Sequence, residues 1–504
     1  MIERILLVDI EQAKGGQLQS RWSHHPLGLM YLASAVKAKH PSIEFQIFHT
    51  ATSKHPEKNL QDILLAFRPD VVGLRTLSIY QDEFRRISRV VRDAAPDAFV
   101  VTGGPYASAS FGDILAELTA DLVVIGEGEV TFTELVSHLS EHQALPSDLQ
   151  GTAVSIDGAV RRNAARPLIP DLDTIARPNY DLVDFRDYKG ISNHAFQEAD
   201  SCAFIESSRG CPYRCYYCHI AREKTTRNRS PESVVGEMEA IYRSYGITDF
   251  VFVDDIFNVP RKTGKEILRL LIKRLPDVRV NFPNGLRADQ LDEEFLDLLQ
   301  EANTVHMALA IETASPRLQK VIGKNLKLDH TKEMLFKASE RFIVCGFFMV
   351  GFPSETVAEA EATVEFARDL TFLAQPVLSI VRVYPETILW DALDPTPEEA
   401  GLLKAQTNRA LQPKLMKDPE FYGDLFSAER VPLKGEDIKH IRWQWMKEVL
   451  VNPERLENSY NVMKKFFTEE QIVLFNKNLF DNEKFSNKHL QSLLKVDARQ
   501  RLSA

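Results

Sequence analysis

The chain has few cysteines, no long apolar run and no excess of basic residues, and each absence disfavours a class of protein. Five cysteines in 504 residues argue against a disulfide framework and are typical of a reducing cytosol. The longest nearly apolar run, residues 342–352, is too short to span a bilayer. A net charge of −10 disfavours nucleic acid as a partner. The one local basic patch, residues 224–229, is expected to be a solvated loop or otherwise a site for an anionic group.

The first eight residues lack the basic segment, apolar core and cleavage site of a signal peptide, so we expect a first strand and a cytoplasmic protein. The chain is too long for one ordinary core. We predict an α/β protein with four regions. These are a doubly wound, Rossmann-like domain (1–140), a linker with a hairpin (141–200), a complete or partial β/α barrel (201–390) and a C-terminal helical region (391–504).

The prediction for residues 1–140 comes from short aliphatic runs that alternate with segments of helical period. Fully apolar strands alternating with helices indicate a parallel sheet covered on both faces. Ligands of such sheets bind beyond the carboxyl ends of the strands. A G-x-G-x-x-G fingerprint is missing, which disfavours a dinucleotide. The predicted strands cover residues 5–8, 45–48, 71–74, 99–102 and 122–125.

Further along, Asp157-Gly158 predicts a tight hairpin turn, and the prolines that follow predict an extended connector. Strands and helices then alternate again, with Ser230-Pro231 and Ser315-Pro316 as helix starts. Repeated βα units of this kind predict a barrel whose chemistry lies at the carboxyl ends of its strands. The predicted strands cover residues 203–206, 249–253, 278–282, 306–311, 342–350 and 377–383.

Three of the cysteines, Cys211, Cys215 and Cys218, stand at C-x3-C-x2-C spacing directly after the first barrel strand. Thiolates so close in one loop can converge on one soft metal centre, which selects iron–sulfur clusters, zinc or copper(I). Structural zinc takes four ligands, and His219 and Cys202 are both poorly placed to supply the fourth. The spacing favours an iron–sulfur cluster with one open iron, with zinc and inert thiols as alternatives. Cys345 is expected to be a buried strand residue.

The segment 211–218, reading C-P-Y-R-C-Y-Y-C, resembles the signature of the radical S-adenosylmethionine (radical SAM) enzymes. The resemblance implies that the three cysteines are catalytic and hold a [4Fe–4S] cluster. It also implies that the open iron binds SAM, and that an external donor of flavodoxin or ferredoxin type supplies the electron that cleaves SAM to a 5′-deoxyadenosyl radical. The matching strand ends imply further SAM-binding residues: Tyr217, Asp254, Asp255, Asn284, Arg287, Glu312, Ser315 and Gly351.

Some of these residues have structural alternatives. Tyr217 is expected beside the adenine but could be loop packing. Asp254 and Asp255 are expected near the SAM amino group, yet they could cap a helix. Glu312, expected near the SAM carboxylate and ribose, could instead pair with Arg287.

Loops of the first domain, at 25–29, 103–107 and 126–129, resemble those of the cobalamin-binding branch of this family. The resemblance implies a corrinoid between this domain and the cluster. The Asp-x-His-x-x-Gly motif is missing, because the first strand ends Asp9-Ile10-Glu11. Each loop could alternatively be only a tight turn. The expected cobalamin contacts are Thr76, Gly103, Gly104, Tyr106, Gly126, Glu127 and Gly128.

The resemblance implies an enzyme that abstracts hydrogen from an unactivated carbon of a small metabolite. In the leading hypothesis, methylcobalamin, remethylated by a second SAM, then methylates the substrate radical. In the second, no methyl group is transferred and the substrate radical is oxidised, cyclised or rearranged. A non-catalytic corrinoid- or metal-binding module is a third hypothesis, disfavoured because it has no need of an open iron. The helical region 391–504 is expected to close the open end of the barrel and keep the radical from water.

Overall fold

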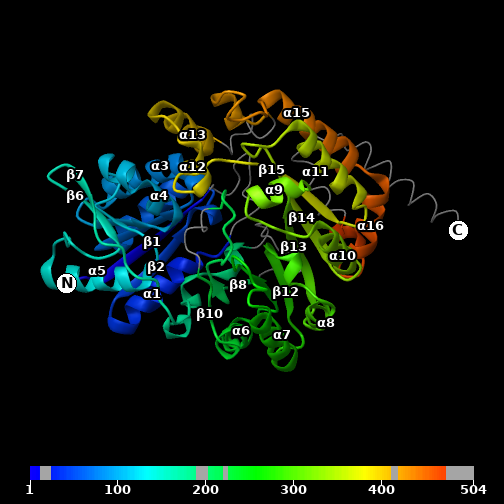
Figure 1. Cartoon of the computed structure of the whole chain (residues 1–504). Coiled ribbons are helices and arrows are strands. Elements are labelled where there is room, and N and C mark those ends of the chain that lie inside the picture. The colour runs from blue at the N-terminus through cyan, green and yellow to red at the C-terminus, as the bar shows by residue number, and fades with distance from the viewer. Residues whose placement is uncertain (12–23, 189–201, 219–224, 410–417, 473–504) are drawn as a thin grey trace.

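The computed structural model describes residues 1–11, 24–188, 202–218, 225–409 and 418–472. Two α/β units lie side by side (Figure 1). Of the C-terminal helices, α15 (Gly435–Gln444) and α16 (Pro453–Met463) lie on the far side of the second unit, whereas α13 (Pro397–Arg409) lies beside the first unit. Among the described residues, none of the helices combines the length and the apolar character that crossing a bilayer requires.

The first unit is built on a twisted sheet whose strand order is β2-β1-β3-β4-β5-β6-β7. The first five strands in that order are mutually parallel, which confirms the predicted doubly wound fold. Alternate residues of β1 point to opposite faces. Leu6 and Val8 therefore pack in one apolar cluster, and Ile5 and Leu7 pack in another. The strands are β1 (Arg4–Ile10), β2 (Glu44–His49), β3 (Val71–Thr76), β4 (Phe99–Gly103) and β5 (Leu122–Val124).

Helices cover both faces of this sheet (Figure 1). One face is packed by α1 (Leu27–Lys39) and α5 (Glu129–His142). The opposite face is packed by α2 (Pro56–Phe67), α3 (Gln81–Ala94) and α4 (Gly104–Ala116). The carboxyl ends of the strands are thereby left as the exposed edge at which loops can bind a ligand.

The predicted hairpin is present, but it belongs to the first unit rather than to a linker. Strand β6 (Thr152–Ile156) pairs antiparallel with β5, and β7 (Ala159–Arg162) pairs with β6. Asp157 and Gly158 both have positive φ, 50° and 78°, as a two-residue hairpin turn requires. Because the hairpin covers the edge of β5, the first unit extends beyond the predicted boundary at residue 140.

The second unit is a partial barrel of parallel strands in the order β15-β14-β13-β12-β11-β8. Ser230 and Ser315 cap their helices as predicted. The strands are β8 (Ala203–Ile205), β11 (Asp249–Phe252), β12 (Arg279–Leu286), β13 (Thr304–Glu312), β14 (Ile343–Val350) and β15 (Gln375–Ile380). The surrounding helices are α6 (Pro231–Tyr245), α7 (Arg261–Arg274), α8 (Glu293–Glu301), α9 (Pro316–Val321), α10 (Leu328–Ser339) and α11 (Val357–Asp369).

The described part of the C-terminal region is helical, as predicted, but it contacts both ends of the barrel. Phe421 and Ile438 contact Gly351, at the carboxyl end of β14. By contrast, Val462 of α16 packs on Ile343, the first residue of β14, and so lies at the opposite end. This region comprises α12 (Ile388–Leu393), α13 (Pro397–Arg409), α15 (Gly435–Gln444), a π-helical turn (Trp445–Leu450) and α16 (Pro453–Met463).

Candidate active site

The three cysteines of the motif lie in the loop that follows β8, at the carboxyl end of the barrel strands. The base of this loop is fixed by two carboxylates that follow β11. Asp254 Oδ1 accepts hydrogen bonds from the Ser207 backbone N–H (3.0 Å) and from the Ser207 and Ser208 hydroxyls (2.7 and 2.6 Å). Asp255 Oδ2 accepts from the Gly210 N–H at 3.1 Å. Burial raises the pKa of Asp254 to about 6. Both acids thus hold the cysteine loop in place through these hydrogen bonds, a structural role that differs from the helix cap given as the alternative.

A second brace comes from residues 322–324, which the sequence did not single out. The Tyr216 N–H donates to the Ile322 carbonyl at 3.1 Å, and the Gly323 carbonyl oxygen lies 4.0 Å from Cys215 Sγ. The contact requires glycine at 323, because φ is +72° and a Cβ there would lie 2.6 Å from the Arg214 carbonyl oxygen.

Replacing Gly323 by alanine is expected to displace the cysteine loop and to lower the iron bound after anaerobic reconstitution at least about tenfold, since metal sites depend on ligand geometry to that extent. Gly246→Ala is the matched control. Gly246 also has positive φ, +68°, but open space around its Cα, so it should cost only about 1 kcal/mol of stability. Equal iron contents in the two variants would contradict the steric argument.

Arg287 braces the same loop rather than pairing with Glu312. Its guanidinium carbon lies 3.7 Å from the centroid of the Tyr213 ring, within cation–π range. It also donates to the Lys324 carbonyl at 2.9 Å and forms an ion pair with Asp289.

Glu312 lies at the centre of the site, where β13 ends with a left-handed φ of 69°. Its Oε1 accepts from the Tyr217 hydroxyl at 2.9 Å and from Lys324 Nζ at 3.0 Å. Glu312 and Lys324 are buried and Tyr217 is partly buried, and burial raises the pKa of Tyr217. The structure therefore brings together two predicted residues, Tyr217 and Glu312, and adds a cation that sequence reasoning missed. A lysine directly after a left-handed glycine was the available signal.

The segment after β14 lies beside Tyr217. Glu355 Oε2 accepts hydrogen bonds from the N–H groups of Gly351 and Phe352, and the Tyr422 hydroxyl donates to the Gly351 carbonyl at 2.7 Å. The Phe352 ring lies 5.7 Å from the Tyr217 ring. Burial raises the pKa of Glu355 to about 7. Tyr217, which is expected beside the adenine, thus lies next to the segment that contains Gly351, another predicted SAM-binding residue.

Two other predicted residues are engaged at the edge of the site. The Ser315 hydroxyl accepts from Leu318 N–H as a helix cap and donates to Glu359 Oε1 at 2.6 Å. The Asn284 amide donates to the Val253 carbonyl at 2.9 Å. Contacts from these two side chains to SAM remain a prediction.

The predicted cobalamin-facing residues of the first unit separate into two groups. Four glycines flank the carboxyl ends of β4 and β5: Gly103, Gly104, Gly126 and Gly128. Thr76 is the last residue of β3, and its hydroxyl donates a hydrogen bond to the Ile10 carbonyl. By contrast, the Tyr106 ring is buried in the apolar core, 5.4 Å from the Phe84 ring, so it is unavailable at the ligand-facing edge. Glu127 points toward the barrel and pairs with Arg209 and Arg227. The first unit therefore keeps its glycine loops at the predicted edge, whereas Tyr106 and Glu127 are engaged by other residues of the protein. Contact of any of these residues with cobalamin stays a prediction.

A second group of metal-ligand side chains, Asp9, Glu11 and His49, is buried at the ends of β1 and β2. Arg75 Nη1 lies 2.8 Å from Asp9 Oδ1. Burial alone would lower the pKa of His49, but its contact with Glu11 raises it. Arg75 and His49 thus face the carboxylates of Asp9 and Glu11, and this group is an internal polar network. Glu11 stands where the missing motif would place histidine.

Cys211, Cys215 and Cys218 lie within one loop of eight residues, where thiolates can converge on one soft metal centre. Cys202 packs with Phe204 and Val251 below the loop, and Cys345 is buried in β14. His219 lies outside the described residues.

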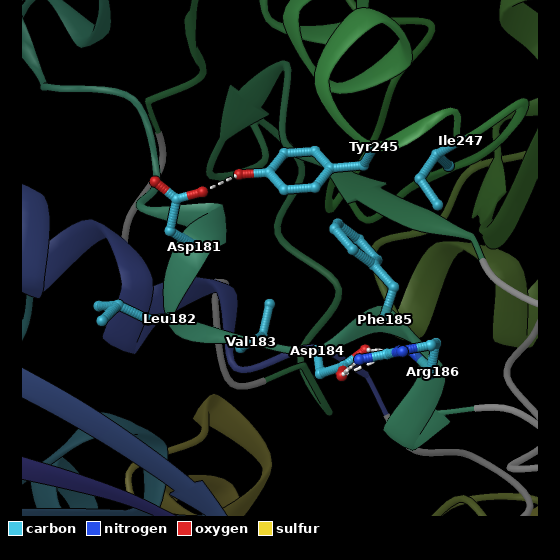
Figure 2. A pocket seen from close by; sticks show the side chains of 8 residues that line it. All are labelled: Asp181, Leu182, Val183, Asp184, Phe185, Arg186, Tyr245 and Ile247. Carbon is cyan, nitrogen blue, oxygen red and sulfur yellow. Dashed lines mark hydrogen bonds and ion pairs between the residues drawn. The ribbon is translucent and has the colours of Figure 1, made fainter.

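Figure 2 shows a separate hollow of about 470 Å³ that contains none of these residues. It lies where the connector meets the end of α6, and Tyr245 there donates to Asp181 at 2.5 Å. Because α6 ends just before β11 begins, this hollow lies at the barrel end opposite to the cysteine loop.

Fold and site together define a two-domain iron–sulfur enzyme, and comparisons with known proteins agree. The Radical SAM superfamily profile matches residues 205–367, and the B12 binding domain profile matches residues 19–136. The "Uncharacterized methyltransferase PH0819" of Pyrococcus horikoshii is 32% identical over 373 residues, which are 73% of this chain and 78% of that protein. The chain belongs to the radical SAM superfamily, in the branch with an N-terminal B12-binding domain. Its cofactors are a [4Fe–4S] cluster, SAM and cobalamin.

Two more distant similarities are informative. The anaerobic magnesium-protoporphyrin IX monomethyl ester cyclase of Rubrivivax gelatinosus is 27% identical over 378 residues, 73% of this chain and 66% of that protein. The solved structure of the radical SAM methyltransferase TsrM from Kitasatospora setae aligns with a TM-score of 0.65 at 21% identity, covering 80% of this chain and 79% of that one. The second similarity shows a shared fold.

Proposed function

We propose that the protein methylates an unactivated carbon of a small-molecule substrate. The observation that carries this proposal is that the carboxyl ends of the two parallel sheets meet. Arg209, two residues before Cys211, pairs with Glu127 in the loop after β5 and with Glu129, the first residue of α5. The cysteine loop and the glycine loops of the first unit are therefore adjacent, as a reaction that needs both cofactors requires.

The chain's own residues hold and shield the reactants. Cys211, Cys215 and Cys218 would ligate three irons and leave one open for SAM. Glu312 with Lys324, and the 351–355 segment with Tyr217, supply polar and aromatic surfaces beside that position. When bound, the cluster supplies an electron for SAM cleavage and cobalamin supplies a transferable methyl group. The C-terminal segment at Phe421 and Tyr422 packs over Gly351 and helps to exclude water.

The electron must come from outside the chain. Two of the five cysteines lie outside the motif, Cys202 and Cys345, and both are buried. Two separate thiols are too few to ligate a second iron–sulfur cluster. We propose a flavodoxin- or ferredoxin-type donor, in keeping with a reducing, cytoplasmic setting. With a net charge of −10, nucleic acid is not proposed as a partner.

The test is anaerobic reconstitution with iron, sulfide and hydroxocobalamin, followed by reduction and addition of SAM. A methylase is expected to show corrinoid absorption bands, to form 5′-deoxyadenosine and to release S-adenosylhomocysteine in an amount equal to the bound cobalamin, even without substrate. Formation of 5′-deoxyadenosine without S-adenosylhomocysteine would instead support the non-methylating alternative, which the similarity to a cyclase favours. A binding module would consume no SAM.

A further inference from the structure

We propose that Arg209, Glu127, Glu129 and Arg227 form an interdomain latch that fixes the cysteine loop against the loop after β5. The latch rests on the proposed function in one respect: its purpose is to set the separation between the cluster and the corrinoid. Its existence rests only on contacts between described residues.

Arg209 reaches carboxylates on both units. Its Nη1 donates to Glu127 Oε1 at 3.2 Å, its Nη2 to Glu129 Oε1 at 2.7 Å and its Nε to Glu206 Oε2 at 2.8 Å. Its side chain is 15% exposed, and its guanidinium carbon lies 5.2 Å from the ring centroid of Tyr31 in α1. A planar guanidinium can serve three acceptors at once, which a lysine ammonium on a flexible stem does less well.

Arg227 closes the latch from the neighbouring strand. The short strands β9 (Ser208–Arg209) and β10 (Arg227–Asn228) pair antiparallel, with Arg227 opposite Arg209. Arg227 Nη1 lies 2.8 Å from Glu127 Oε1 and donates to the Ile169 carbonyl at 2.7 Å, while the Ile169 N–H donates to Glu127 Oε2 at 2.8 Å. Glu127 is therefore held by two arginines and the connector. The described part of the basic patch, residues 225–229, is therefore not the solvated loop that was expected. Arg227 belongs to the latch, and Arg229 forms a buried ion pair with Glu237.

The position of the latch argues for a role beyond folding. The latch joins two segments that each contain a glycine with positive φ, Gly126 (82°) and Gly210 (83°). Because glycine can adopt many backbone conformations, neither segment is held in place by its own backbone alone. Burial raises the pKa of Glu206 to about 7, and the two arginines face the carboxylates of Glu127 and Glu129 directly. Opposite charges paired in this way can hold a fixed geometry without strong internal repulsion.

The test compares wild type with Arg209→Met, Arg209→Lys and Glu127→Gln. Amide hydrogen exchange in residues 126–129 is expected to speed up at least about tenfold in R209M, because one partner of a buried charged network is removed. R209K should recover only part of the protection, and E127Q should affect the same loop. In the reconstituted protein, pulsed EPR between the reduced cluster and cob(II)alamin should give a broader distance distribution in R209M, with wild-type iron and cobalamin contents. Arg261→Met, which breaks the exposed pair with Asp292 inside the barrel, is the control and should change neither measurement.

Unchanged exchange of this loop in both R209M and E127Q would overturn the proposal. So would an equal rise in exchange throughout both units, because that result would mean general destabilisation. Failure of the wild type to bind cobalamin would instead contradict the proposed function. Amide hydrogen exchange of the cobalamin-free wild type and variants would still decide whether the latch exists.

Discussion

Replacing Cys215 by alanine is expected to abolish reductive cleavage of SAM. Two thiolates cannot hold a cluster that needs three, and loss of a metal-binding side chain costs more than the 10- to 100-fold typical of outer-shell partners. We therefore expect 5′-deoxyadenosine formation to fall by at least about a hundredfold. The measurements are iron and sulfide per chain after anaerobic reconstitution, and 5′-deoxyadenosine after reduction.

The protein contains its own controls for this prediction. Cys202→Ala and Cys345→Ala each remove a buried thiol that lies away from the loop. Both variants should keep the full iron content and SAM cleavage. The cluster assignment would be wrong if C215A retained four irons and activity. Loss of iron in C202A would instead mean that this cysteine is a fourth ligand.

Replacing Arg455 by methionine is expected to have the largest effect on stability. Arg455, in α16, is 1% exposed, and it donates to the backbone carbonyls of Ala367, Leu370, Leu373 and Val449. Ala367 lies in the last turn of α11 and Leu370 is its C-cap residue, at a helix end where carbonyls carry negative partial charge. Burial lowers the pKa of Arg455 to about 10, yet the group stays charged at neutral pH.

Methionine matches the length of the arginine stem but donates no hydrogen bonds, so R455M should lose about 3–5 kcal/mol, the usual cost of removing one side of a buried charged contact. The measurement is urea unfolding followed by tryptophan fluorescence, because Trp390, Trp443 and Trp445 report on this part of the chain. Lys464→Met is the control, since Lys464 is exposed just beyond α16. It should shift the midpoint little. Equal shifts in the two variants would contradict this account of Arg455.

Much of the fold could be predicted from the sequence because its signals are local. Aliphatic runs such as residues 5–8 and 249–253 gave strands close to their observed bounds, and the Asp157-Gly158 turn was found from two residues. The partner of the hairpin was not predictable. Pairing of β6 with β5 depends on which sheet edge is open after the first unit has folded, and no local pattern records that.

In the candidate site, too, the features that depend on local sequence were predictable, and those that depend on tertiary contacts were not. The cysteine spacing identified the metal-binding loop, and the comparisons confirmed the family. The residues that hold this loop were found by type but given other roles, as with Asp254 and Arg287, or were missed, as with Lys324. Their partners are distant in sequence: Asp254 accepts from Ser207, 47 residues earlier, and Arg287 donates to the Lys324 carbonyl, 37 residues later.

By itself, the sequence marked the metal-binding loop, because thiolates at close spacing in one loop can converge on one soft metal centre; the cluster, SAM and cobalamin were implied by the resemblance of its motifs to a known family. It also determined the two parallel sheets, since hydrophobic periodicity is written into each segment. Only the tertiary structure decided what each buried charge does. A carboxylate such as Glu127 can bind a ligand, cap a helix or pair with an arginine, and the choice depends on which group the packing of distant strands brings within hydrogen-bonding distance.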